Sequence, residues 1–182
     1  MIENQEVLEI EELEAQLIAR EVSFDQLRRQ YAKFLLELLN DGRIRSISEE
    51  RRLELVFFLR DSVGRVKLDV DDSIVKAQVS KLCAMERTRG TQELELSIFA
   101  RCVIFCFRDG KQWAAEDSGD PTPLYLYFIT LKRVLPKMRQ EFVTFIRELL
   151  HPRWGVMGEC GNHRLLSGRR GVATFSLVTR LR

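Results

Sequence analysis

The chain has 182 residues and a formal net charge of +2, and 45% of its residues are hydrophobic while 31% are charged. This composition is that of a globular domain with a sizeable core, and it excludes an intrinsically disordered chain. No apolar run is long enough to form a transmembrane helix and the N-terminus lacks an apolar signal region. We therefore expect a cytoplasmic protein with no membrane contact, and the nucleus is the alternative location.

Acidic residues dominate the first 22 positions, which hold seven glutamates and one arginine. The apolar spacing predicts a helix over residues 3–20. We assign residues 1–22 to an acidic helical arm, for which two interpretations are open. The arm either packs on the body through Leu13 and Leu17, or it is a docking and self-association element that contacts a partner through Glu9 and Glu12.

A capping box predicts the start of the next helix, because Ser23 is followed three residues later by Gln26. Gly42 provides a left-handed C-terminal cap, so the helix is expected to end just before it. One face of this helix is apolar, which predicts its burial. The residues of that face are Phe24, Leu27, Tyr31, Phe34, Leu35 and Leu38.

Two further helices are predicted between residues 46 and 86. Ser46 and Glu49 match a second capping box, and Gly64 is expected to stop the helix that it opens. We expect this helix to bury Leu53, Val56, Phe57 and Leu59. Asp72 is expected to cap the following helix. Its apolar positions are Ile74, Val75, Ala77, Val79, Leu82 and Met85.

The segment from Leu94 to Phe107 is apolar on nearly every side, which favours a central, buried helix. A β-strand over Ile98–Phe107 is the alternative, because this run is rich in β-branched and aromatic residues. A polar loop that includes Trp113 follows. Two more helices are predicted over residues 124–135 and 138–150, and Pro136 either kinks the first or starts the second.

The last 30 residues, 153–182, hold six arginines, five glycines and no lysine. We predict a basic Gly/Arg-rich tail that is flexible or ordered by a partner. Residues 23–152 then form a helical core domain. The fold class that follows is all-α, a compact helical bundle or orthogonal array of six to seven helices with an acidic N-terminal helix and a basic C-terminal tail.

No catalytic signature is present in this sequence. It lacks a P-loop, a dinucleotide-binding glycine fingerprint and a zinc helix with two histidines. Cys102 and Cys106, one helical turn apart, could be joined by Cys160 and His163 as zinc ligands, but this spacing is much less specific than tight Cys-x-x-Cys pairs. We therefore expect no metal, no cofactor, no small-molecule substrate and no enzymatic activity.

We expect instead a non-enzymatic adaptor or assembly subunit that binds another protein and self-associates. Trp113, Tyr125 and Trp154 are the candidate anchors, together with Glu9 and Glu12, because aromatic residues dominate interface energetics. The alternative is an accessory nucleic-acid-binding subunit that contacts the phosphate backbone without reading sequence. Its candidate phosphate-binding residues are Arg28, Arg29, Arg43, Arg45, Arg51, Arg52, Arg164, Arg169 and Arg170.

Overall fold

The computed structural model describes residues 2–88, 93–110 and 123–151, and the side chains from residue 5 onward within these ranges. These residues are helical apart from their connections, and no strand occurs among them, so the predicted all-α fold class is confirmed. The helices are α1 (Ile2–Ala19), α2 (Phe24–Asn40), α3 (Glu49–Gly64), α4 (Ser73–Glu86), α5 (Leu94–Phe105), α7 (Pro123–Lys132), α8 (Arg139–Arg147) and the short 3-10 helix η2 (Glu148–Leu150).

Local capping signals place both ends of α2. The Ser23 side chain accepts a hydrogen bond from the backbone of Gln26, whose side chain accepts one from the Ser23 backbone, so the predicted capping box is confirmed. At the other end Gly42 has φ +66°, and the backbone N–H of Arg43 donates to the carbonyl of Leu38. This is the Schellman arrangement that a left-handed glycine allows.

The start of α3 differs from the prediction by two residues. Its N-cap is Ser48, whose hydroxyl accepts from the backbone N–H of Arg51 at 3.4 Å. The Ser46 hydroxyl instead donates to Glu95 at the start of α5, and Ile47 is buried between the two serines. Since Ile47 is anchored in the core, the chain cannot turn into the helix until Ser48.

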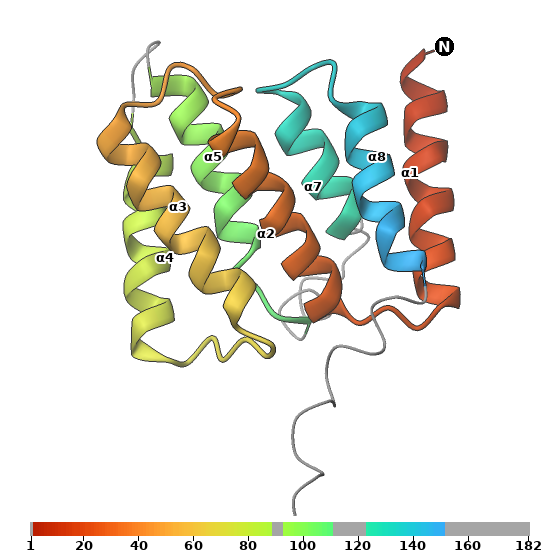
Figure 1. The fold of residues 1–182 in the computed structure, drawn as a ribbon, viewed down its shortest axis with the longest axis horizontal. Helices are drawn as coiled ribbons and strands as arrows, with labels where there is room; N and C mark the ends of the chain where they lie inside the picture. The colour runs from red at the N-terminus through yellow and green to blue at the C-terminus, as the bar shows by residue number, and fades with distance from the viewer. Residues whose placement is uncertain (1, 89–92, 111–122, 152–182) are drawn as a thin grey trace, which may run out of the picture. The chain divides into compact units, whose positions relative to one another are not determined.

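Helices α2 and α5 occupy the middle of the described fold (Figure 1). Helix α2 contacts α3, α5 and α8, and α5 contacts α4, α7, α2 and α3. The strand alternative for residues 98–107 was therefore wrong, and the central buried helix is confirmed. A helix that is apolar on nearly all sides buries its side chains against neighbours on several sides at once.

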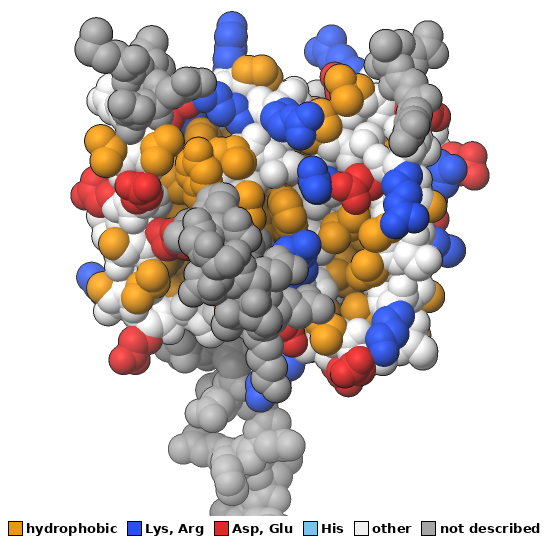
Figure 2. Space-filling model, turned by 180° about the vertical axis from the view of Figure 1, so that it is seen from behind, with side chains coloured by type: hydrophobic (Ala, Val, Ile, Leu, Met, Phe, Trp, Pro, Cys, Tyr) orange, Lys and Arg blue, Asp and Glu red, His pale blue; other side chains and the backbone are white. Residues whose placement is uncertain are grey.

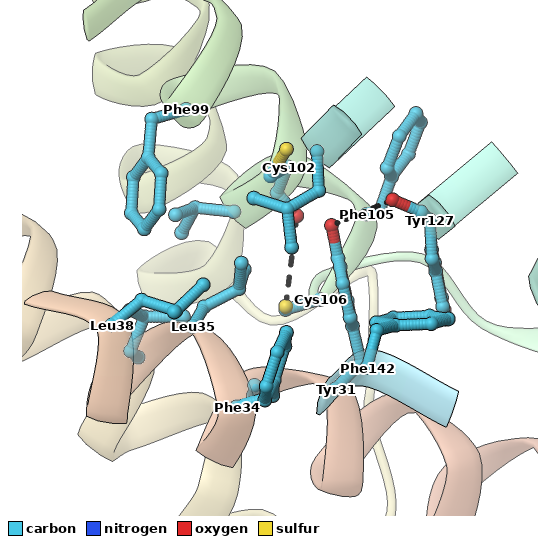
Figure 3. Packing of buried hydrophobic residues seen from close by; sticks show 14 of the residues in the cluster. Tyr31, Phe34, Leu35, Leu38, Phe99, Cys102, Phe105, Cys106, Tyr127 and Phe142 are labelled. Carbon is cyan, nitrogen blue, oxygen red and sulfur yellow. Dashed lines mark hydrogen bonds between the residues drawn. The ribbon is translucent and has the colours of Figure 1, made fainter. Parts of the chain in front are cut away.

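Aromatic rings fill the core between α2, α5, α7 and α8 (Figure 3). The rings of Tyr31 and Tyr127 stack in parallel with centroids 4.1 Å apart, and the Tyr31 hydroxyl donates to the Tyr127 carbonyl at 3.4 Å. Phe142 contacts the rings of Tyr31 and Phe34 edge-on. The two edge-on contacts have a geometry that the aromatic quadrupole favours.

Helix α1 packs against α7, α8 and η2. Ile10, Leu13 and Leu17 are buried at the helix–helix contact, at spacings of three and four residues. On the flank, Glu6 pairs with Lys132. Helix α1 thus belongs to the same helical unit as the core, which extends to Pro152.

Pro136 lies in the connection between α7 and α8, so it separates two helices rather than kinking one. Helix α7 ends three residues earlier than predicted because its last turn opens before that proline. No helix among the described residues combines the length and the apolar composition that a membrane crossing requires.

Candidate functional site

The first candidate residue, Arg28, is completely buried at the junction of α2, α3 and α5. Its Nη1 lies 3.1 Å from the carbonyl oxygens of Ser62 and Cys106, and its Nη2 lies 2.8 Å from that of Arg65. Asp25 accepts from the same guanidinium at 3.2 Å. These carbonyls end α3 and α5, so the cation offsets the negative poles of two helix dipoles.

Arg28 is therefore not a phosphate-binding residue, contrary to our expectation. The sequence contained a signal for its burial, because Phe24, Arg28, Tyr31 and Leu35 follow one another at spacings of four, three and four residues. That spacing places the arginine within the apolar stripe of α2. A buried guanidinium needs several acceptors, and carbonyls at helix ends provide them.

Several other candidate arginines also bind within the chain. Arg29 donates to the carbonyl of Val63 at 3.0 Å, and Arg52 donates to the carbonyl of Leu39 in the last turn of α2 and to that of Ile44 in the following connection. Two more form ion pairs, Arg43 with Glu141 and Arg51 with Glu54.

Arg45 differs from these, because it is exposed and has no hydrogen bond or ion pair to another described residue. The fold thus brings Arg43, Arg45 and Arg51 to the α2–α3 connection, while Arg28, Arg29 and Arg52 hold helix ends. Arg164, Arg169 and Arg170 lie outside the described residues.

The predicted partner contacts are not gathered at one place. Glu9 is half-buried and lies 3.6 Å from Arg139 and 3.8 Å from Arg147, so it ties α1 to α8. Glu12 is exposed on the outer side of α1. Tyr125 is partly buried and packs against the core. Trp113 and Trp154 lie outside the described residues.

The two thiols of α5 lie in the core. The Cys106 thiol donates to the carbonyl of Cys102 at 3.7 Å (Figure 3). Burial raises the pKa of Cys102 to about 12 and raises the pKa of Cys106 as well. Both are therefore protonated at neutral pH, whereas a nucleophile or metal ligand must be a thiolate. Among the described residues no three metal-binding side chains converge, and Cys160 and His163 lie outside them.

The outer face of α3 carries the largest departure from the predicted burial. We expected Leu53 and Phe57 inside, but their exposed fractions are 61% and 63%. The buried side of α3 is formed by Leu55, Phe58, Leu59 and Ser62. Since α3 has apolar residues on two sides, its sequence pattern does not reveal which side faces the core.

A groove runs beside these exposed residues, between α3 and α4. It has a volume of about 290 Å³, and its lining includes Phe57, Ile74, Ala77, Gln78 and Lys81. Ile74, one of the apolar positions of α4, is 57% exposed. Gln78 is 5% exposed, and its Oε1 has no hydrogen-bond partner among the described residues. We name Leu53, Phe57, Ile74 and the groove lining the α3–α4 face.

The connection between α3 and α4 holds this face in shape. Arg65 pairs with Asp61 at 2.7 Å and with Asp72 at 3.0 Å, so it links the end of α3 to the cap of α4. The backbone N–H of Ile74 donates to Asp72 at 2.7 Å, and this hydrogen bond together with Arg65 lowers the pKa of the Asp72 carboxyl. Asp72 is therefore ionised at neutral pH and fixes the first turn of α4.

A second, larger groove lies between α4 and α5, with a volume of about 560 Å³. Its lining is mostly apolar, from Val79, Cys83, Ile104 and Phe107, and Lys76 lies at its edge. Figure 2 shows the molecule from behind, where hydrophobic side chains form patches bordered by lysine and arginine side chains. In this second groove the apolar side chains are partly or fully buried, so it exposes less apolar surface than the α3–α4 face.

No protein-family model, no curated protein and no solved structure matches this chain. The candidate site is therefore defined by its own geometry, as an exposed apolar face with a groove.

Proposed function

We propose that this protein is a non-enzymatic helical interaction module that binds another protein through its α3–α4 face. The observation that carries the proposal is the exposure of Phe57 and Ile74 in the lining of one groove, with Leu53 also exposed one turn before Phe57 on α3. Exposed apolar side chains that cluster are typical of interaction sites, whereas isolated ones are ordinary. Burying the exposed parts of Phe57 and Ile74 would contribute roughly 1–2 kcal/mol each.

The groove has the features of a site for an amphipathic helix. Its lining comes from two helices and includes the aromatic side chain of Phe57 and the largely buried amide side chain of Gln78. Helix-in-groove recognition uses apolar anchors at helical spacing together with a few polar contacts. The non-enzymatic part of the proposal rests on the sequence, in which no catalytic motif occurs.

A peptide-display selection on the full chain tests this proposal. We would use a library of amphipathic helical peptides of about 15 residues, which corresponds to roughly four turns. Peptides selected on the wild type should bind Phe57→Asp at least about tenfold more weakly, which corresponds to about 1.4 kcal/mol. Leu94→Asp is the matched control, because Leu94 is 55% exposed but lies on α5 outside the face.

Two results would contradict the proposal. One is a selection that enriches no peptide, and the other is a set of peptides that bind the wild type and Phe57→Asp equally. If only Leu94→Asp lost binding, the site would have to be placed on α5.

The second candidate function is an accessory nucleic-acid-binding subunit, and one observation favours it. Arg45 is exposed at the α2–α3 connection without a partner among the described residues, beside Arg43 and Arg51. Binding of labelled single- and double-stranded RNA and DNA at several salt concentrations tests it. Affinity should fall steeply with salt, and Arg45→Ser should reduce the salt slope by about one. Absence of binding at low salt removes this candidate.

A further inference from the structure

The exposed large apolar side chains fall mainly on two helical surfaces. Leu53, Phe57 and Ile74 lie on the α3–α4 face, and Leu8 and Ile18 lie on the outer side of α1, with exposed fractions of 63% and 70%. In Figure 1 these surfaces are at opposite edges of the helical unit, with α3 and α4 at one edge and α1 at the other. The contacts agree, because α1 packs on α7, α8 and η2, while α4 packs on α5.

The outer side of α1 is amphipathic although its inner side is already buried. Leu8, Glu11, Ala15 and Ile18 follow one another at spacings of three, four and three residues, so they form one stripe. Glu12 lies next to this stripe. Both Glu11 and Glu12 are exposed, and neither has a cation partner among the described residues. We name these five residues the α1 outer face.

The α3–α4 face carries cationic side chains, which are opposite in sign to Glu11 and Glu12 on the α1 outer face. Arg60, one turn after Phe57, is exposed and has no ion pair among the described residues. Lys81 lines the groove with its side chain 66% exposed, and its Nζ is 4.0 Å from Glu54. Glu50 lies one turn before Leu53 and Glu54 pairs with Lys81, so of Arg60 and Lys81 only Arg60 lacks an ion pair among the described residues.

The unpartnered oxygen of Gln78 adds a polar requirement. A docked helix has no free backbone donors in its middle turns, so the donor must come from a side chain. On α1 the exposed Gln5 and Gln16 flank the outer face and carry side-chain amides, and that of Gln16 donates to Glu12 within the helix at 3.4 Å. A buried acceptor that gains a donor on binding favours a partner with such a group over a purely apolar one.

We propose that copies of this chain associate head to tail, with the α1 outer face of one copy docked on the α3–α4 face of the next. Leu8 and Ile18 then cover the groove beside Phe57 and Ile74, and Glu11 and Glu12 meet Arg60 and Lys81. This inference rests on the proposed function and identifies the partner as a second copy. Two different surfaces make the contact heterologous, so the copies form a ring or an open chain.

The experiment measures the mass of the full chain by light scattering after size exclusion, over a range of concentrations. Wild type should exceed the 21.3 kDa chain mass increasingly with concentration. Phe57→Asp, which damages only the α3–α4 face, and Leu8→Asp, which damages only the α1 outer face, should each remain at the monomer mass. Leu94→Asp is the control and should associate like the wild type.

The decisive sample is the mixture of the two damaged chains. Phe57→Asp keeps an intact α1 outer face and Leu8→Asp keeps an intact groove, so together they should form a species of two chains and nothing larger. A charge-reversed pair refines the test. Glu11→Lys with Glu12→Lys in one chain should restore association with Arg60→Glu and Lys81→Glu in another, while each alone stays monomeric.

Three results would overturn the inference. The first is a wild type that stays monomeric up to about 1 mM, the concentration range of very weak complexes. The second is association of either damaged chain by itself, because that requires an interface between like surfaces. The third is a mixture that fails to pair. A monomeric wild type whose groove still selects peptides would overturn self-docking alone, whereas failure of the peptide selection would overturn the proposed function.

The three single variants, Phe57→Asp, Leu8→Asp and Leu94→Asp, change side chains that are exposed in the isolated chain, so each is expected to fold. Circular dichroism and the thermal midpoint of each variant check this before the masses are compared. A variant that melts well below the wild type is replaced by the serine substitution at the same position, so that loss of association is not confused with loss of fold.

Discussion

Arg28 and Phe57 are both placed against the usual preference of their side chains. The charged residue is completely buried where α2, α3 and α5 meet, while the aromatic residue is 63% exposed at the α3–α4 edge. At Arg28, the protein supplies carbonyl acceptors from two helix ends and a carboxylate. At Phe57, the ring contacts Phe58 edge-on, but the described residues leave most of it exposed. The hydrogen-bond donors of the buried cation therefore have acceptors within the chain, whereas most of the Phe57 ring stays in contact with solvent.

This difference separates the structural role of Arg28 from the binding role that we propose for Phe57. A buried charge survives only where its hydrogen-bonding groups are satisfied, so its partners report what the fold requires. An exposed aromatic side chain contributes little to the stability of the chain that carries it. Contacts within the chain therefore explain the burial of Arg28, whereas the exposure of Phe57 supports the proposed contact with a partner.

The sharpest test of this comparison is a pair of adjacent phenylalanines on α3. Phe58 is 2% exposed and Phe57 is 63% exposed. Phe58→Ala should lower the free energy of unfolding by about 3–5 kcal/mol, because it loses buried area and leaves a cavity. Phe57→Ala should change it by less than about 0.5 kcal/mol. Urea denaturation measures both, and similar losses in the two variants would show that Phe57 is a core residue.

Arg28→Met tests the buried side of the comparison. The substitution removes the guanidinium donor from the carbonyls of Ser62 and Arg65 and leaves the Cys106 carbonyl with the Ser62 hydroxyl alone, so we expect a loss of about 3 kcal/mol in unfolding free energy. Arg28→Lys should also destabilise the protein, because an ammonium cannot reproduce the planar fork that reaches three carbonyls.

The control for this substitution is Arg45→Met, which removes an exposed arginine without a partner among the described residues and should be nearly neutral. Equal stability of Arg28→Met and the wild type would show that the buried cation is dispensable.

Much of the fold followed from local signals, whereas the site did not. The capping box at Ser23, the cap at Asp72 and the left-handed Gly42 are short-range features, and the sequence places them correctly. The face of α2 was also predictable because its apolar residues lie on one side. Helix α3 is apolar on two sides, so only its packing on α2 and α5 decides that Phe57 is exposed.

The contacts of three basic candidates could not be predicted for a related reason. Sequence reasoning counted arginines as surface charges, but the side chains of Arg28, Arg29 and Arg52 reach carbonyls of residues between eight and 78 positions away. Such long-range acceptors are invisible in a local pattern. The position of Arg28 inside an apolar stripe was the only local sign of its role.

Gly42 precedes α3 and Gly64 is its last residue. Substitutions at these two glycines test whether the backbone geometry of the turns, rather than packing, sets the orientation of α3. A side-chain Cβ would meet no atom within 4 Å at Gly42 or at Gly64, but only Gly42 has a positive φ. Gly42→Ala should therefore cost about 1–2 kcal/mol through backbone strain alone. Gly64→Ala should be neutral or stabilise by up to about 1 kcal/mol. Thermal unfolding measures both, and a neutral Gly42→Ala would mean that the turn tolerates another conformation.

The smallest expected effect concerns Glu21, which follows α1 with φ +55°. It occupies the left-handed position of a Schellman arrangement, because the backbone N–H of Val22 donates to the carbonyl of Leu17 at 3.0 Å. A glycine there would relieve roughly 1 kcal/mol of strain, and its greater freedom in the unfolded chain would offset about half of that gain. We therefore expect Glu21→Gly to stabilise the protein by about 0.5 kcal/mol, or about 1–2 °C in Tm. Glu21→Ala removes the same carboxylate but keeps the Cβ, so it should give no gain. If both substitutions raised Tm equally, the charge rather than the backbone would be the cause, and the end of α1 would be held by its packing on α8.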